Sequence, residues 1–365
     1  MDAFWEFVNS LQENINPSID EDQAIEMLSQ HMITKPVFAA IFEDSSFVSQ
    51  NPVSQSMQKM IHLLEENGFE KDTEVFAKFY QSVQDTCRGL DNAAGRQSVI
   101  VRLYDNFFRI AFPRMVEQLG IVYTPPAIVD FILHSVNDVL QKEFGRTLSD
   151  PSVHILDPFT GTGTFIARLL ESDLIRPEDL DRKYSSEIFA NEIVLLAYYI
   201  AAINIENAYH ARMPSAPYTP FPGICLTDTF QMTEWDKREH IASEFFLQNS
   251  AKVEEQKAKP ITVIIGNPPY SAGQKSANDN AQNQEYPKLE EKIGATYAAD
   301  SAATLKNSLY DSYIKAFRWA TDRLDKNGGI IGFITNGGWL DGNAMDGFRK
   351  HLANDFSSIY VFNLR

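Results

Sequence analysis

Four consecutive residues, Asn267-Pro268-Pro269-Tyr270, carry the clearest chemistry in the sequence. The two prolines fix the backbone and remove two N–H donors, so the acceptors that remain are the side-chain oxygen of Asn267 and the carbonyl of Pro268. Two such acceptors can bind both hydrogens of an amino group and turn its nitrogen lone pair toward an electrophile. Tyr270 adds a ring on which a base or another planar group can stack. A rigid turn is the alternative interpretation of the same prolines.

A second motif, residues 157–165, reads Asp-Pro-Phe-Thr-Gly-Thr-Gly-Thr-Phe and ends an apolar run. It fits the end of a strand, a glycine turn and the start of a helix. Gly161 and Gly163 allow the backbone to turn sharply and to approach a ligand closely. Asp157 can accept hydrogen bonds from a ligand amine or hydroxyl. The motif is not the dinucleotide pattern G-x-G-x-x-G, because Ile166 stands at its third glycine; a generic strand-to-helix turn is the alternative.

Three further residues can complete a nucleoside site. Glu192 can accept hydrogen bonds from both ribose hydroxyls, as acids do in dinucleotide folds, or it can be a charge that favours a helix start. Asp228 ends another apolar run and can accept a bond from an adenine amino group, or serve as an ordinary turn residue. Tyr123 can close over a nucleoside, or be an unremarkable aromatic residue.

The segment that follows Tyr123 has a structural role of its own. Thr124 suits the N-cap and Pro125 the first position of a helix that we predict over Ala127–Phe144. A second helix is predicted over Ile188–Glu206. These helices belong to an alternation of strand-like and helix-like segments from about residue 121 onward, which is typical of a parallel sheet covered by helices.

The predicted fold class is therefore α/β, with the motifs at the carboxyl ends of buried strands, where open α/β sheets place ligands. A charged connector at Asn249–Pro260 is expected to be a solvated face. The polar stretch Ser271–Asn307 is expected to be a functional loop, because loops of that length are usually functional or disordered. The expected strands are 153–157, 185–191, 223–227, 261–266, 329–335 and 358–363.

The first 120 residues are predicted to be helical. Apolar residues recur with helical periodicity between Asp72 and Thr86, and Ser18 with Glu21 forms a potential capping box. The apolar cluster Phe107–Phe112 is interpreted as packing. The sequence lacks the phosphate loop G-x-x-x-x-G-K-[ST], so a P-loop ATPase is excluded.

Composition favours a globular intracellular protein. The 365-residue chain has 44% hydrophobic residues and a net charge of −17, which lowers the expectation of tight DNA binding without excluding DNA as substrate. Neither a membrane-spanning run nor a secretory signal is present. Cys87 and Cys225 are too far apart for a disulfide framework or a zinc site, and the seven histidines are scattered. We therefore expect a cytoplasmic protein without a metal.

Taken in order, these motifs resemble those of the amino-group DNA methyltransferases that make N6-methyladenine, specifically their gamma class. The resemblance covers about residues 115–365. The helical N-terminal part and the segment Tyr360–Arg365 are similar to the coupler and methyltransferase regions of single-chain type ISP restriction-modification enzymes. This resemblance implies a coupler-like domain over residues 1–120 and, over 121–365, a catalytic domain with a Rossmann-like methyltransferase sheet.

The same resemblance implies S-adenosylmethionine as cofactor and double-stranded DNA as substrate. Glu192 would bind the cofactor ribose and Asp228 its adenine, while a flipped target adenine would present its N6 amine to Asn267 and Pro268 and its ring to Tyr270. Methyl transfer would be direct. The implied catalytic residues are Asn267, Pro268, Pro269 and Tyr270; the implied cofactor residues are Tyr123, Thr124, Pro125, Asp157, Pro158, Phe159, Thr160, Gly161, Gly163, Thr164, Phe165, Glu192 and Asp228.

The sequence also departs from that family. It stops at Arg365, just after the sixth expected strand, without the family's seventh strand, target-recognition domain, helicase or nuclease. We therefore expect a piece of a longer parent that carries those domains, truncated at its C-terminus. Two alternatives stay open: a protein-glutamine methyltransferase, whose substrate amide presents the same amino geometry, and a cofactor-binding coupler fragment without turnover.

Overall fold

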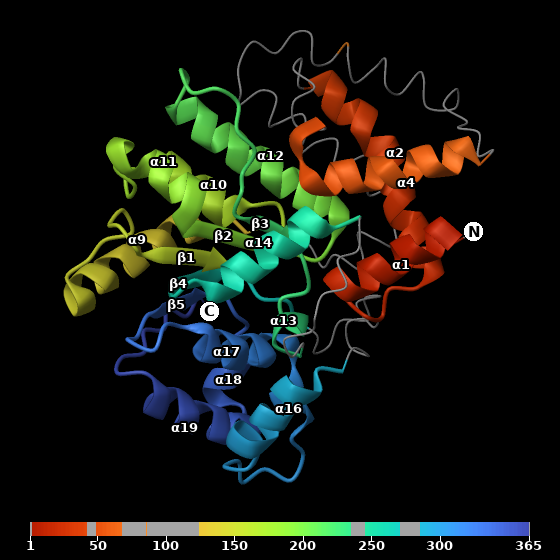
Figure 1. The fold of residues 1–365 in the computed structure, drawn as a ribbon. Coiled ribbons are helices and arrows are strands. Elements are labelled where there is room, and N and C mark those ends of the chain that lie inside the picture. Colours follow the sequence, from red (N-terminus) through yellow and green to blue (C-terminus); the bar gives the residue numbers. More distant parts are fainter. Residues whose placement is uncertain are drawn as a thin grey trace.

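Five parallel strands form one sheet in the order β3-β2-β1-β4-β5 (Figure 1). The computed structural model describes residues 2–41, 49–67, 85, 124–234, 245–270 and 285–364. The strand order reverses between β1 and β4, and it matches the first five strands of the Rossmann fold, so the predicted fold class is confirmed. The strands are β1 (His154–Asp157), β2 (Ile188–Glu192), β3 (Ile224–Leu226), β4 (Ile261–Gly266) and β5 (Ile330–Phe333).

Successive strand residues point to opposite faces of the sheet, and each face has its own apolar layer. Ile155 and Val263 belong to the core under α9, α10 and α12, whereas Leu156 and Ile264 belong to the core under α16, α17 and α19. Both faces are therefore buried, as expected of a parallel sheet. The bounds are α9 (Pro126–Phe144), α10 (Thr164–Glu171), α12 (Leu195–Arg212), α16 (Pro287–Ile293), α17 (Ser312–Arg323) and α19 (Asp346–Asp355).

The N-terminal helices pack on the outer side of α12 and against α14 (Figure 1). His31 Nδ1 lies 2.9 Å from the Tyr199 hydroxyl, and Asn51 Nδ2 donates to the Tyr198 hydroxyl at 3.2 Å. Since the sheet and the N-terminal helices both cover α12, this helix is apolar on nearly every side. The other α-helices in the described ranges are α1 (Asp2–Asn14), α2 (Glu21–Ile41), α4 (Pro52–Glu66), α11 (Leu180–Arg182), α13 (Gln231–Glu234), α14 (Leu247–Ala258) and α18 (Gly338–Asp341).

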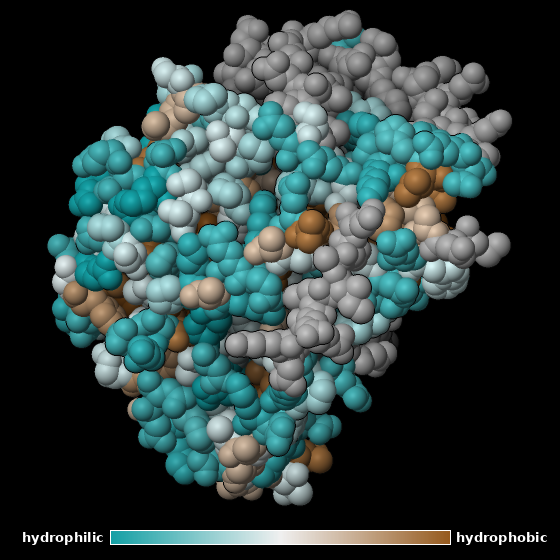
Figure 2. All heavy atoms as spheres, in the orientation of Figure 1, coloured by the Kyte–Doolittle hydropathy of each residue, from teal (hydrophilic) through white to brown (hydrophobic). Residues whose placement is uncertain are grey.

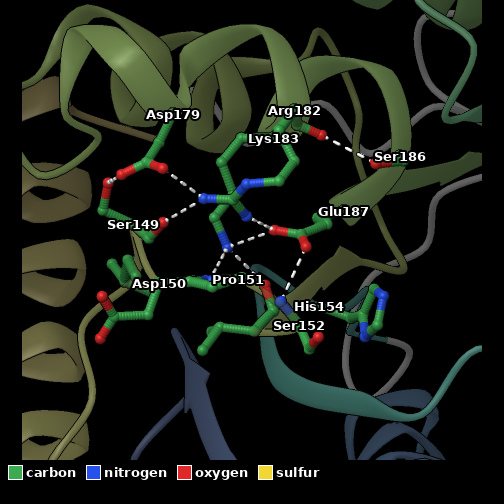
Figure 3. Close-up of polar contacts among 12 residues, drawn as sticks. Ser149, Asp150, Pro151, Ser152, His154, Asp179, Arg182, Lys183, Ser186 and Glu187 are labelled. Atoms are coloured by element: carbon green, nitrogen blue, oxygen red, sulfur yellow. Dashed lines mark hydrogen bonds and ion pairs between the residues drawn. The ribbon is translucent and has the colours of Figure 1, made fainter.

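A buried ionic network holds the starts of β1 and β2 together (Figure 3). Lys183, which is fully buried, donates to the carbonyls of Asp150 at 2.7 Å and Val153 at 2.8 Å, and pairs with Glu187 at 2.9 Å. Glu187 also pairs with Arg182 and accepts from the Ser152 N–H at 2.7 Å. Burial lowers the pKa of Lys183 to about 8. The network lies at the amino ends of the strands and so has a structural role.

Three sequence expectations about elements were wrong. Residues 358–363 form no strand and are largely exposed. The stretch 271–307 is not a loop throughout, because it contains α16 and a helical turn at Gly294–Ala298, while residues 271–284 lie outside the described ranges. The connector at 249–260 is mostly α14, which buries Asn249, Val253 and Gln256.

Helix boundaries also differ from the expectations in detail. Asp20 and Gln23, rather than Ser18 and Glu21, form the capping box of α2, with reciprocal side-chain to backbone bonds of 2.8 and 3.0 Å. The helix predicted from Ile188 begins only at Leu195, because Ile188–Glu192 is strand β2. The segments 72–86 and 107–112 lie outside the described ranges, apart from Asp85, and so does the proposed domain boundary at residue 120, which stays a prediction.

The surface seen in Figure 2 is mostly hydrophilic, and its apolar residues gather in small groups. That distribution agrees with a net charge of −17. Within the described ranges, none of the helices is both long enough and apolar enough to cross a membrane.

Candidate cofactor and amino-group site

The carboxyl ends of four neighbouring strands carry the predicted polar residues. Asp157 ends β1, Glu192 ends β2, Asp228 follows β3 by two residues, and Asn267 directly follows β4. Because all these strands are parallel, the four side chains share one edge of the sheet. The switch point between β1 and β4 lies among them, which is where α/β sheets bind ligands.

Asp157 lies at the junction of the two motifs. Its Oδ1 would be only 2.8 Å from a Cβ atom on Gly266, the residue just before Asn267. The carboxyl is fully buried and accepts a bond from the Phe159 N–H at 3.2 Å, while Oδ2 has no partner among the described residues. Burial raises the pKa of Asp157 to about 8. An unpaired buried acceptor is costly unless a ligand uses it.

The two glycines of the turn differ in the space around them. Gly161 has φ +56°, and a Cβ there would meet no atom of the described residues within 4 Å, so that part of the structure leaves the turn open to a ligand at this point. Gly163 has φ +83°, and a Cβ there would lie 3.0 Å from the Ala201 Cα of α12. Gly161 therefore fits ligand approach, whereas Gly163 is required for helix packing.

Glu192 connects the glycine turn after β1 to the end of β2. Its two carboxylate oxygens accept from the N–H groups of Gly161 and Val194, each at 2.8 Å. Burial raises the pKa of Glu192 to about 7, and hydrogen bonds from the backbone N–H groups of Val194, Gly161 and Ile193 oppose that shift. Each carboxylate oxygen can accept more than one bond, so the group can also receive ligand hydroxyls. The next side chain, Ile193, is 45% exposed and offers an apolar surface beside it.

Asp228 is buried and heavily bonded. Its Oδ1 accepts from the N–H groups of Phe230 at 2.9 Å and Gln231 at 3.3 Å. Its Oδ2 accepts from Asn16 Nδ2 at 2.6 Å and from the Tyr286 hydroxyl at 2.8 Å. Burial raises the pKa of Asp228, and these donors oppose the rise.

Asn267 and Tyr270 contact each other. The Tyr270 hydroxyl donates to Asn267 Oδ1 at 2.5 Å and lies 3.1 Å from the carbonyl oxygen of Ile334. Asn267 Nδ2 donates to the Thr124 hydroxyl at 3.3 Å. The second lone pair of Asn267 Oδ1 remains for another donor. Pro268 is buried and Pro269 is exposed.

Other predicted site residues have structural surroundings. Pro125, not Thr124, is the N-cap of α9, and Pro126 takes the first helical position, so the predicted capping role of Thr124 was wrong. Phe165 is 3% exposed in the core. Phe159 packs on Phe230 and Phe333. Pro158 and Thr160 are buried in the turn, Thr164 is half-buried at the start of α10, and Tyr123 lies outside the described residues.

Sequence reasoning missed Asn16 and Tyr286, the two side chains that donate to Asp228. Asn16 is 212 residues away from Asp228 in the sequence, and Tyr286 is 58. Neither belongs to a motif, so no local pattern marks them. Ile193 could have been predicted as a ligand-contacting residue, because it is apolar and directly follows Glu192 at the end of the strand.

Two family models match the chain. The coupler domain of type ISP restriction-modification enzymes matches residues 1–95, and the Eco57I restriction-modification methylase matches residues 186–364. The first covers the N-terminal helices α1, α2 and α4. The second covers β2 to β5 and thereby Glu192, Asp228 and Asn267.

Solved structures with high similarity agree with this assignment. A nuclease-deletion mutant of the type ISP enzyme LlaGI, in complex with a DNA substrate mimic, is 49% identical with a TM-score of 0.90, covering 97% of this chain and 28% of that one. The type ISP enzyme LlaBIII bound to DNA is 50% identical, with a TM-score of 0.89 and coverages of 96% and 24%. The DrdV–DNA complex is 36% identical, with a TM-score of 0.85 and coverages of 97% and 34%.

The chain thus spans 24 to 34% of the length of these relatives. Over that span its helical and methylase parts follow the same fold. In sequence and in structure, the chain corresponds to the coupler and methylase region of type ISP restriction-modification enzymes.

Proposed function

We propose that the chain binds S-adenosylmethionine at the carboxyl edge of the sheet and transfers its methyl group to the N6 amine of a flipped adenine in DNA. One observation carries the proposal. The buried carboxyl of Asp157 approaches Gly266, the residue before Asn267, through Oδ1, and its Oδ2 has no partner among the described residues. An acceptor for a ligand amine therefore lies close to an acceptor for a substrate amine.

The residues at this edge fit that cofactor. Asp157 Oδ2 would accept from its ammonium group, Glu192 from its ribose hydroxyls, and Asp228 from its adenine amine. Ile193 would pack on the adenine ring. Three buried acids on one edge favour a ligand with positive charge. When bound, the cofactor supplies an electrophilic methyl group on a sulfonium sulfur.

The residues after β4 would handle the substrate. Asn267 Oδ1 and the Pro268 carbonyl would accept the two hydrogens of the amine, which directs its lone pair toward the methyl group. Tyr270 would stack on the base, since its ring stays in place while its hydroxyl holds Asn267. Thr124 would fix the orientation of the Asn267 amide. Such a reaction depends mainly on positioning.

DNA as the substrate is supported by the relatives, which were solved with DNA or a DNA mimic. We propose that this region serves a restriction-modification system in a longer parent, in which helicase, nuclease and target-recognition domains deliver the DNA. A protein-glutamine substrate and a cofactor-binding fragment without turnover are the competing outcomes of the test.

The test has two halves. Calorimetry with S-adenosylmethionine examines the cofactor site, and transfer of labelled methyl groups to DNA, set against a release-factor protein, examines the substrate. We expect binding and transfer to DNA. Asn267→Ala should reduce transfer at least about 100-fold, as for loss of a transition-state contact, while cofactor affinity stays within about twofold. Transfer to the release factor alone would contradict the proposal.

A further inference from the structure

Three distant segments meet at one carboxylate. Asp228 follows β3, Asn16 follows the N-terminal helix α1, and Tyr286 precedes α16. Asn16 and Tyr286 both donate to Asp228 Oδ2, at 2.6 and 2.8 Å. All three residues are at least nine-tenths buried. The N-terminal helices therefore reach the proposed cofactor site directly.

Asn16 is itself held in one orientation. Its Oδ1 accepts from the Ser18 N–H at 2.8 Å and from the Ser18 hydroxyl at 2.7 Å. An amide presents its oxygen on one side and its nitrogen on the other, so these two bonds direct Nδ2 at Asp228.

The surrounding helices keep this arrangement in register. Asn14, at the end of α1, accepts from the Ser250 hydroxyl of α14. The neighbouring Asn249 bonds both the N–H and the carbonyl of Leu226 in β3, each at 2.9 Å. The end of α1 is thus connected through α14 to the strand that precedes Asp228.

The other carboxylate oxygen, Oδ1, is held by backbone donors. Of its two backbone donors, the Gln231 N–H is the more distant, at 3.3 Å against 2.9 Å for Phe230. A stronger donor can displace a long hydrogen bond at small cost. The bonds from Asn16 and Tyr286 to Oδ2 fix the orientation of the carboxylate. Oδ1 is then directed at the Gln231 N–H, whose hydrogen bond is the weaker of the two backbone bonds.

We propose that Asn16, assisted by Tyr286, is a positioning residue for cofactor recognition: it orients Asp228 so that Oδ1 accepts the 6-amino group of the cofactor adenine. This inference rests on the proposed function. It gives the coupler-like N-terminal helices a direct effect on cofactor affinity, because movement of Asn16 would release Asp228.

The experiment compares two ligands on the whole chain by calorimetry. One is S-adenosylhomocysteine; the other is its purine analogue, in which hydrogen replaces the 6-amino group. We expect Asn16→Ala to weaken S-adenosylhomocysteine about tenfold, the scale of one hydrogen bond to a charged group, and to leave the purine analogue within about twofold. Tyr286→Phe, which removes only the hydroxyl, should show the same selective loss.

Gln30→Ala is the matched control, since Gln30 and Asn16 are both amides of the N-terminal helical part and each is 5% exposed. Gln30 Nε2 donates to Glu26 of its own helix, and Gln30 does not contact Asp228. It should leave the ratio of the two affinities unchanged. Equal weakening of both ligands by Asn16→Ala and Tyr286→Phe would mean a merely structural role and overturn the inference, as would unchanged or tighter adenine binding. Failure of the native chain to bind either ligand would instead reject the proposed cofactor site, and this inference with it.

Discussion

Asp157 and Glu192 are buried carboxyls at the proposed site, and each has a raised pKa. Burial raises the pKa of Asp157 from 3.8 to about 8 and that of Glu192 from 4.5 to about 7. Both groups are therefore partly protonated near neutral pH when no ligand is bound. A ligand that donates hydrogen bonds to them, or carries positive charge, favours their ionised forms.

Cofactor binding should consequently release protons. We expect net release near pH 7 and an affinity that rises between about pH 6 and 8, measured by calorimetry in buffers of different ionisation enthalpy. Because the folded pKa values lie above the unfolded ones, the contribution of these groups to stability is complete below about pH 4 and is lost as the pH rises through about 7 to 8. Proton uptake on binding would contradict the assignment of Asp157 and Glu192.

At this scale the sequence predicted the residues that stand in local motifs. Asp157, Glu192, Asp228 and Asn267 could be found because each ends or closely follows a recognisable apolar strand, and the structure brings all four to one edge. The roles assigned to them stay predictions. Asn16 could not be found, because a hydrogen bond across 212 residues leaves no local pattern.

Between elements, the two glycines of the turn should behave differently. Gly161→Ala puts a methyl group into open space at φ +56°, whereas Gly163→Ala puts one against the Ala201 backbone of α12. The left-handed conformation costs each alanine about 1–2 kcal/mol. Overpacking adds about 1–3 kcal/mol at Gly163 only.

We therefore expect Gly163→Ala to lower the free energy of unfolding, measured in urea, more than Gly161→Ala does. Gly161→Ala should in turn show the larger loss of cofactor affinity for a given loss of stability. If the two variants are equally stable, the described packing of α10 on α12 is wrong.

The Lys183 network should affect stability without affecting the site. Lys183→Met leaves Glu187 and two carbonyls without their buried partner, a change that typically costs about 3–5 kcal/mol. Chemical denaturation measures the loss, and cofactor affinity at low temperature should be unchanged because the network lies at the opposite edge of the sheet. Lys142→Met, at an exposed lysine, is the control and should change little.

The element predictions failed where a pattern needed tertiary context. Residues 358–363 have strand-like composition, but β propensity is expressed only beside a pairing partner, and none pairs with them among the described residues. The helix α16 was overlooked because lysines and glutamates surround its buried residues Leu289 and Ile293. Their four-residue spacing was present, and it marks one face of a helix.

At the scale of the whole molecule, the net charge and the regions outside this chain determine how DNA reaches the proposed site. A net charge of −17 makes tight binding to a phosphate backbone unfavourable, so delivery of DNA by other regions fits the chain better than autonomous binding. The relatives carry about two-thirds or more of their length outside the matched region. We expect methyl transfer by this chain alone to be slow and to change little with added salt, because few phosphate contacts are there to be lost. A salt titration of the initial rate checks this, and a steep fall would instead indicate a basic DNA-binding face.

The most direct measurement identifies the methylated nucleoside. The chain is incubated with labelled S-adenosylmethionine and a duplex in which adenine faces a mismatched base, because a mismatch lowers the cost of flipping. The DNA is then digested and its nucleosides are separated. We predict label in N6-methyladenosine of the deoxy series, and its loss in the Asn267→Ala variant. Label on cytosine, or equal label with the variant, would contradict the proposed chemistry.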